Sequence, residues 1–182
     1  MLTTIEAVKE QLCIPADDTS QDNMLERMIK AATDAIEAEC RRDFEKQEYE
    51  DTFQLPHYRI KDGLILSGYP VDEVIEIKLN EEELFDWEIN KRLGFISSNK
   101  AKETGELKVK YTAGYILPGE TDRDLPYDIE DACILLAASN YNTGGAAGIK
   151  DERVDQLQIR YVDQDMPKAV KRVIERHKDW RR

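Results

Sequence analysis

Cysteine and histidine are scarce in this sequence, and each shortage excludes a class of site. The three cysteines, Cys13, Cys40 and Cys133, lie far apart and form no C-x-x-C pair. Their spacing excludes a disulfide framework and argues against a zinc ribbon. The two histidines, His57 and His177, have no suitably spaced partner with which to build a metal site. The sequence therefore predicts no bound metal, and His57 is expected at a surface or a strand edge.

Apolar stretches long enough to span a membrane are also missing, since none approaches the roughly 20 residues that a transmembrane helix requires. The first residues carry neither the basic flank nor the apolar core of a signal peptide, so we expect a cytosolic protein. The glycine-rich segment 144–148 lacks the Gly-Lys-Ser/Thr ending of a phosphate-binding loop, and it precedes no helix whose N-terminus could hold the anion. The glycine-rich composition of this segment predicts a flexible connector.

Charge, in contrast, is abundant and unevenly distributed. The chain carries a net charge of −12, but residues 167–182 hold seven lysines or arginines and two acids, so this end carries +5 and the remainder −17. An acidic body with a basic end can bind copies of itself, or another protein, head to tail. The acidic body is poorly suited to hold the phosphates of a nucleic acid.

Apolar residues at helical spacing predict two helices within residues 1–45. Thr3 and Glu6 have the spacing of a capping box, which would start the first helix at Thr3. The second helix is expected from about residue 21 to residue 42. Its apolar face consists of Leu25, Met28, Ile29, Ala32, Ile36 and Cys40. We expect small buried thiols at Cys40 and Cys133, rather than ligands or nucleophiles.

From Tyr49 onward the apolar residues recur with a period of two. Three runs alternate between apolar and charged residues, and their apolar members are Ile75, Ile77 and Leu79; Phe85, Trp87 and Ile89; and Leu107, Val109 and Tyr111. Each run predicts a strand with one buried face. We therefore expect an antiparallel meander over residues 49–111, which closes on the segment YTAGY at 111–115.

A third helix is predicted over residues 126–141, because Pro126 suits the first turn of a helix. This helix is apolar almost all round, at Ile129, Ala132, Cys133, Leu135, Leu136, Ala137 and Ala138. A helix with so little polar surface must be covered by other elements on several sides. It is expected to be either the central core helix or a helix that a neighbouring subunit partly covers.

Residues 142–166 predict a flexible loop and an extended arm, in which Leu157, Ile159 and Tyr161 alternate with polar residues. An amphipathic, basic helix is expected over residues 167–182. The candidates for binding a partner protein are Lys171, Arg172, Ile174, Arg176, His177 and Trp180. In such an interface Trp180 would be an apolar anchor and the cations would be pairing groups. Packing of this helix within its own chain is the alternative.

The residues alone leave two other functions open. A nucleic-acid-binding module would use the basic C-terminal helix, with phosphate contacts from Arg172, Arg176 and Arg181. A small hydrolase would need a pair of carboxylates in different environments. The adjacent acids Glu81–Glu83 occupy a predicted turn, where they are expected to be solvated, so no catalytic residue is assigned.

Several short segments occur in a particular order along the chain. They are MLTTIEAVK at 1–9, LERMIKAA at 25–32, CRRDF at 40–44, LSGYPV at 66–71, YTAGY at 111–115 and LPYDI at 125–129. This ordered set resembles the head–tail connector (adaptor, head-completion) family of tailed bacteriophages and prophages. The resemblance extends over nearly the whole chain, to about residue 162.

The resemblance implies an α+β, mainly helical fold in a single connector domain of residues 1–182. A small helical bundle would form the core, with an inserted antiparallel β meander and a C-terminal helix. No catalysis and no cofactor are implied. In relatives the C-terminal segments reach toward the portal, so residues 167–182 are expected to do the same.

The resemblance also implies a set of partners. They are further copies of the chain in a ring of about a dozen subunits, the portal protein of the phage head, and a tail-completion or stopper protein. DNA would pass through the channel of the ring without sequence-specific binding, and no membrane would be involved. Assembly is expected in the cytoplasm of the bacterial host, and the final location is the neck of the virion.

Overall fold

A computed structural model of the chain describes residues 1–55, 63–83, 87–98, 104–144, 151–154, 157–160 and 166–181. The chain forms two compact units. The helical unit comprises Met1–Arg42 and Leu117–Trp180, and the sheet unit comprises Asp43–Ile116 and the last two residues. Phe85, Tyr161, His57 and the connector residues 145–148 lie outside the described residues.

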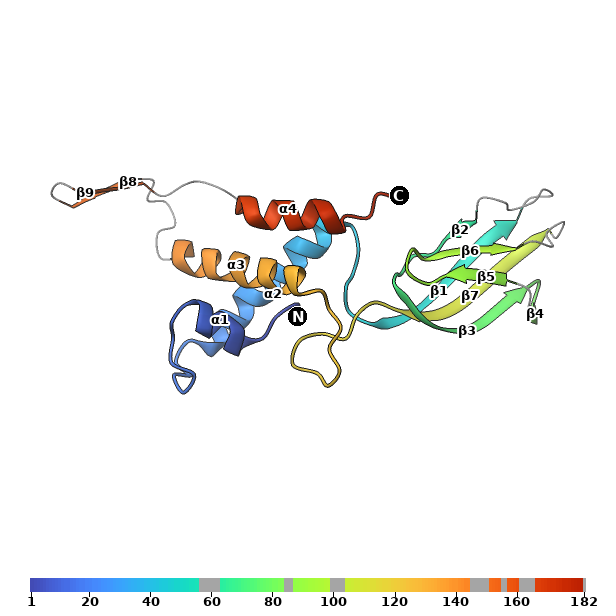
Figure 1. Ribbon diagram of the computed structural model, residues 1–182, viewed down its shortest axis with the longest axis horizontal. Coiled ribbons are helices and arrows are strands. Elements are labelled where there is room, and N and C mark those ends of the chain that lie inside the picture. Colours follow the sequence, from blue (N-terminus) through green and yellow to red (C-terminus); the bar gives the residue numbers. More distant parts are fainter. Residues whose placement is uncertain are drawn as a thin grey trace. The chain divides into compact units, whose positions relative to one another are not determined.

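The helical unit is built around α3 (Figure 1). Its helices are α1 (Ile5–Gln11), α2 (Asp22–Cys40), α3 (Tyr127–Gly144) and α4 (Lys168–His177). α3 contacts the other three helices, so most of its apolar surface is covered within the chain. Its buried residues are Ile129, Ala132, Cys133, Leu136, Ala137 and Ala138. None of the described helices is long and apolar enough to cross a membrane.

The start of α1 differs from the sequence prediction by one residue. Thr4 is the N-cap, and its side-chain oxygen accepts a hydrogen bond from the backbone N–H of Ala7 at 3.3 Å. Thr3 is buried beside the fully buried Leu2, and so it does not cap the helix. The predicted capping box of Thr3 and Glu6 is therefore wrong, because burial of the first threonine leaves the second to satisfy the free backbone donor.

The sheet unit contains two antiparallel sheets. The first has the order β1 (Gln47–Leu55), β7 (Gly105–Ala113), β3 (Val71–Leu79) and β4 (Glu82–Glu83), and the second has the order β2 (Leu64–Ile65), β6 (Phe95–Ser98) and β5 (Trp87–Asn90). Leu107, Val109 and Tyr111 of β7 are fully buried, as predicted, and belong to one apolar cluster with Ile96 of β6. A separate antiparallel hairpin is formed by β8 (Asp151–Val154) and β9 (Leu157–Arg160).

The register of β3 corrects one prediction from the sequence. The pairing with β7 shifts between Val71 and Glu73 and again between Val74 and Glu76. Such bulges insert an extra residue and turn the following side chains over. Ile75 is therefore 49% exposed, whereas Ile77 packs against the core of the sheet unit. The expectation that both share one buried face is wrong.

The expectation of a mainly helical fold is also wrong. Within the described residues the chain has nine strands beside its four helices, and it is an α+β protein with substantial sheet. The strands form a core of their own, whose buried members, from Leu55 to Ala113, all belong to the sheet unit. The reason is that the alternating residues of the two sheets supply enough apolar surface to bury against each other.

Candidate docking surface

The C-terminal helix α4 is fixed to the helical unit by one apolar face. Val170 and Ile174, which lie one turn apart, are buried, and α4 contacts both α2 and α3. Beyond the end of the helix, the backbone N–H of Asp179 donates to the carbonyl oxygen of Cys40 at 2.8 Å. Ile174 is therefore part of the core of the helical unit.

The opposite face of α4 is basic and open to solvent. Lys171 and Arg172 are exposed, and neither has an ion-pair partner among the described residues. Trp180, beyond the end of the helix, is 70% exposed. Its indole N–H donates to the carbonyl oxygen of Glu175 at 3.4 Å, and the ammonium of Lys178 lies 5.4 Å from the ring centre. The ring is thus held against the helix end while a large apolar surface stays uncovered.

The last turn of α4 is attached to the first turn of α3 through Asp128. One carboxylate oxygen of Asp128 accepts hydrogen bonds from Arg176 at 2.7 Å and from Nε2 of His177 at 3.0 Å. Burial by itself would raise the pKa of Asp128, but these bonds from His177 and Arg176 hold it below its ordinary value. Asp128 is not among the residues predicted from the sequence. Its only signal is an acid in the first turn of an apolar helix, where the helix dipole favours negative charge.

Replacing Asp128 by asparagine is expected to lower the free energy of unfolding by about 0.5–1 kcal/mol at neutral pH, since the carboxylate is partly exposed. The folded-state pKa is lowered, so the contribution is fully present above the unfolded-state pKa of about 3.9 and is lost as the pH falls through the folded-state value. Urea unfolding at neutral and strongly acidic pH measures the loss. Asp131→Asn, one turn further along α3, is the control. An equal difference at both pH values would contradict this account.

The six predicted docking residues are divided by the fold. Ile174 is buried, Arg176 and His177 contact α3, and Lys171, Arg172 and Trp180 remain open to solvent. Arg181, which a nucleic-acid-binding helix would use, is engaged in the sheet unit. Its guanidinium lies 3.7 Å from the ring centre of Tyr69 and donates to the carbonyl oxygen of Leu93. Two of the three proposed phosphate-binding arginines thus already have protein partners.

The described residues contain no group of three or more His, Cys, Asp or Glu side chains that could hold a metal ion. The prediction of buried thiols is confirmed, because Cys40 and Cys133 are both buried and burial raises the pKa of each to about 11. Such thiols are mostly protonated at neutral pH and therefore poor nucleophiles.

Glu81, one of the three adjacent acids at residues 81–83, is exposed and forms an ion pair with Lys108 at 2.7 Å.

One protein family and a set of solved structures are similar to this chain. The family model described as "Head completion protein" matches residues 1–180. No curated protein matches the sequence.

The similar structures are chains of gene transfer agent (GTA) particles. A chain from the neck of an empty GTA particle computed with C6 symmetry is 22% identical, with a TM-score of 0.62, over 95% of this chain and 87% of that chain. One from the neck of a native GTA particle computed with C12 symmetry is 22% identical, with a TM-score of 0.55, over 85% and 81%. One from the virion of a native GTA particle is 23% identical, with a TM-score of 0.60, over 95% and 87%. At these identities the likeness shows a common fold.

Proposed function

Because the chain belongs to the head completion protein family, we propose that it is a non-enzymatic structural protein in the neck of a phage or prophage particle. In this proposal copies of the chain assemble in the host cytoplasm into a ring. The ring joins the portal of the head to a tail-completion or stopper protein and continues the DNA channel. The family match over residues 1–180 is the observation that carries the proposal, and the fold shared with chains of GTA necks supports it.

Two observations support a ring of about a dozen subunits. The similar neck structures were computed with C6 and C12 symmetry. In this chain, α3 is covered by three helices, yet Tyr127, its first residue, is 73% exposed and Leu135 is 38% exposed. Large exposed apolar side chains on one helix are typical of a surface that another protein covers.

The charge of the chain supports passage of DNA rather than binding to it. The net charge is −12, and the basic residues are concentrated at the C-terminal end. Affinity for DNA depends on cations that neutralise phosphates. A channel wall made of the acidic part of the chain would therefore let DNA pass without retaining it.

For the portal contact we propose the open face of α4. Trp180 offers the largest exposed apolar side chain near this helix, and Lys171 and Arg172 are cations without ion-pair partners among the described residues. Tryptophan and arginine are the residue types typical of interface hot spots. Val170 and Ile174 hold the helix in place, so Lys171 and Arg172 are presented on a rigid element.

Trp180→Ala and the double variant Lys171→Glu/Arg172→Glu are each expected to weaken binding to the portal protein of the same genome at least about tenfold. These side chains are exposed, so the circular dichroism spectrum and the unfolding transition should stay close to those of the wild type. Arg92→Glu, an exposed charge reversal in the sheet unit, is the matched control. Biolayer interferometry measures the affinities.

The same experiment tests the proposed function. Rings on the portal, seen by electron microscopy of the wild type, are the expected result. A wild-type chain that stays monomeric at high concentration and has no affinity for the portal would overturn it. DNA binding that falls steeply with salt and is lost in Arg172→Glu would favour a nucleic-acid-binding module instead.

A further inference from the structure

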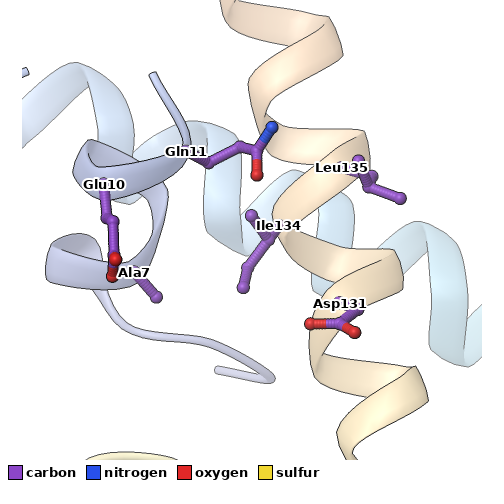
Figure 2. Close-up of a pocket in the computed structure, with 6 residues that line it drawn as sticks. All are labelled: Ala7, Glu10, Gln11, Asp131, Ile134 and Leu135. Atoms are coloured by element: carbon purple, nitrogen blue, oxygen red, sulfur yellow. The ribbon is translucent and has the colours of Figure 1, made fainter. Parts of the chain in front are cut away.

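A shallow groove runs between α1 and α3 in the helical unit. Its volume is about 480 Å³, and it is lined by Ala7, Glu10, Gln11, Asp131, Ile134 and Leu135. Figure 2 shows the side chain of Ile134 between the two helices, and Leu135 on the side of α3 that points away from α1. Ile134 is half-buried and gives the groove an apolar floor that is open to solvent, and the exposed Leu135 lies at the outer edge of the groove.

The two charged residues of this groove, Glu10 and Asp131, are both acidic, and Gln11 beside them is neutral. Glu10 and Asp131 are exposed, and neither has an ion-pair partner among the described residues. The neighbouring Lys9 does not neutralise them, because its ammonium lies 2.6 Å from Asp22 and its side chain is almost wholly buried. A groove of this kind suits a partner that carries a cation beside apolar side chains.

The outer face of α2 offers a cation beside apolar side chains, although the exposed Asp34 and Lys30, which is paired with Glu26, also lie on this face. Met24, Met28 and Ala31 follow one another at spacings of four and three residues, so they lie on one stripe of the helix. Met24 is 39% exposed, Met28 is half-buried and Ala31 is exposed. Arg27 lies beside them, exposed and without an ion-pair partner among the described residues. Methionine side chains are unbranched and adapt to irregular apolar surfaces.

We infer that the outer face of α2 in one copy of the chain packs into the α1–α3 groove of the next copy. Arg27 then lies beside Asp131 and Glu10, and Met24 and Met28 cover the apolar floor. The inference deepens the proposed ring and rests on it. The two surfaces share no residue, so the contact is heterologous, and its repetition by a rotation that closes gives a ring.

The basic face of α4 fits the groove less well. Between Lys168 and His177 no large apolar side chain is exposed, and the exposed Trp180 lies beyond the end of the helix, so the helix itself offers only cations to the floor of the groove. Assigning α2 to the groove also leaves the open face of α4 free for the portal. The two proposed contacts therefore use different surfaces of the same subunit.

A charge exchange tests the pairing. Arg27→Glu and Asp131→Lys are each expected to weaken self-association of the full chain at least about tenfold, because like charges then face each other. The double variant Arg27→Glu/Asp131→Lys restores opposite charges and should recover to within about threefold of the wild type. Arg92→Glu and Glu73→Lys, exposed reversals in the sheet unit, are the matched controls. Analytical ultracentrifugation over a concentration series measures association, and circular dichroism confirms that each variant is folded.

Cross-linking provides a second readout of the same contact. In a Cys13→Ser background, one variant carries Met24→Cys and another carries Leu135→Cys; Cys40 and Cys133 are buried and protected. A bismaleimide should join the mixed variants at least about tenfold more efficiently than Met24→Cys mixed with Thr52→Cys.

The outcomes separate this inference from the proposed function. If the wild type forms rings but the exchanged charges and the cysteine pair behave like the controls, the interface is overturned and the proposed function stands. If this contact forms but no ring assembles on the portal, the proposed function fails alone. If the wild type does not self-associate, with or without the portal, both are overturned.

Discussion

Replacement of Gly114 by alanine is expected to lower the free energy of unfolding by about 3–4 kcal/mol, from backbone strain and overpacking together. Gly114 has a φ of +109°, a backbone conformation that L-residues with a side chain rarely adopt. A Cβ atom there would lie 2.5 Å from the carbonyl oxygen of Glu45 and 2.9 Å from the Cα of Lys46. Both atoms belong to the backbone, so no side-chain rotation can relieve the overlap.

The segment opposite Gly114 is held on both sides. The N–H of Tyr115 donates to the carbonyl oxygen of Phe44 at 2.7 Å, and the N–H of Lys46 donates to the carbonyl oxygen of Tyr115 at 2.9 Å. The N–H of Gly114 itself donates to the carbonyl oxygen of Pro70. Moving the chain away from a new Cβ would break these bonds, and this is why the expected loss is large.

Gly119→Ala is the matched control for this prediction, and urea unfolding measures both variants. Gly119 also has a positive φ, of +94°, but a Cβ atom there would meet only the methyl group of Thr4 at 3.5 Å. This variant has the backbone strain without the overlap, so we expect a loss of about 1–2 kcal/mol. Equal losses at the two positions would show that strain alone acts and that the contact with Glu45 is unimportant.

The second large effect is expected at Asp51. Its replacement by alanine should lower the free energy of unfolding by about 3 kcal/mol. The carboxylate of Asp51 accepts hydrogen bonds from the hydroxyl of Tyr111 at 2.6 Å, from the backbone N–H of Ser67 at 2.6 Å and from the hydroxyl of Ser67. The hydroxyl of Tyr111 in turn accepts from the N–H of Gly68 at 2.9 Å. Burial and the bond to Asp51 raise the pKa of Tyr111, so the phenol stays protonated and donates.

A double-mutant cycle with Tyr111→Phe isolates the network. That variant leaves Gly68 without its acceptor and should cost about 2 kcal/mol, while the stacking on Tyr49, at a ring separation of 5.5 Å, is retained. The two losses should not add, because each variant already disrupts the same bonds. Thr52→Ala, exposed on the opposite face of β1, is the control. Additive losses from chemical denaturation would contradict a connected network.

Much of the element order is predictable from local patterns. The alternation of Leu107, Val109 and Tyr111 correctly predicts a buried face of β7. The stripe from Leu25 to Cys40 correctly predicts α2, except that Met28 is half-buried and lies on the outer face. Cys40 and Cys133 fall on apolar positions and are buried as expected. These predictions succeed because each depends on the period of neighbouring residues, which is a property of the sequence itself.

The predictions that are wrong concern residues whose position depends on packing against other parts of the chain. Which of two adjacent threonines caps α1 depends on which one the core buries, and the position of Ile75 depends on a bulge against β7. The docking candidates show the same limit. An amphipathic helix is predicted over residues 167–182, yet the helix ends at His177, so Ile174 is buried whereas Trp180, beyond the end of the helix, is exposed.

The sequence by itself therefore determined the elements, the uneven charge and, through the order of its short segments, the family. The tertiary structure alone decided that the strands form a second core, that Asp128 holds the end of α4, and that Asp51 and Tyr111 meet across the sheet. The physical reason is range. Periodicity and capping act over a few residues, whereas these contacts join positions about 50 to 60 residues apart, and no local pattern records them.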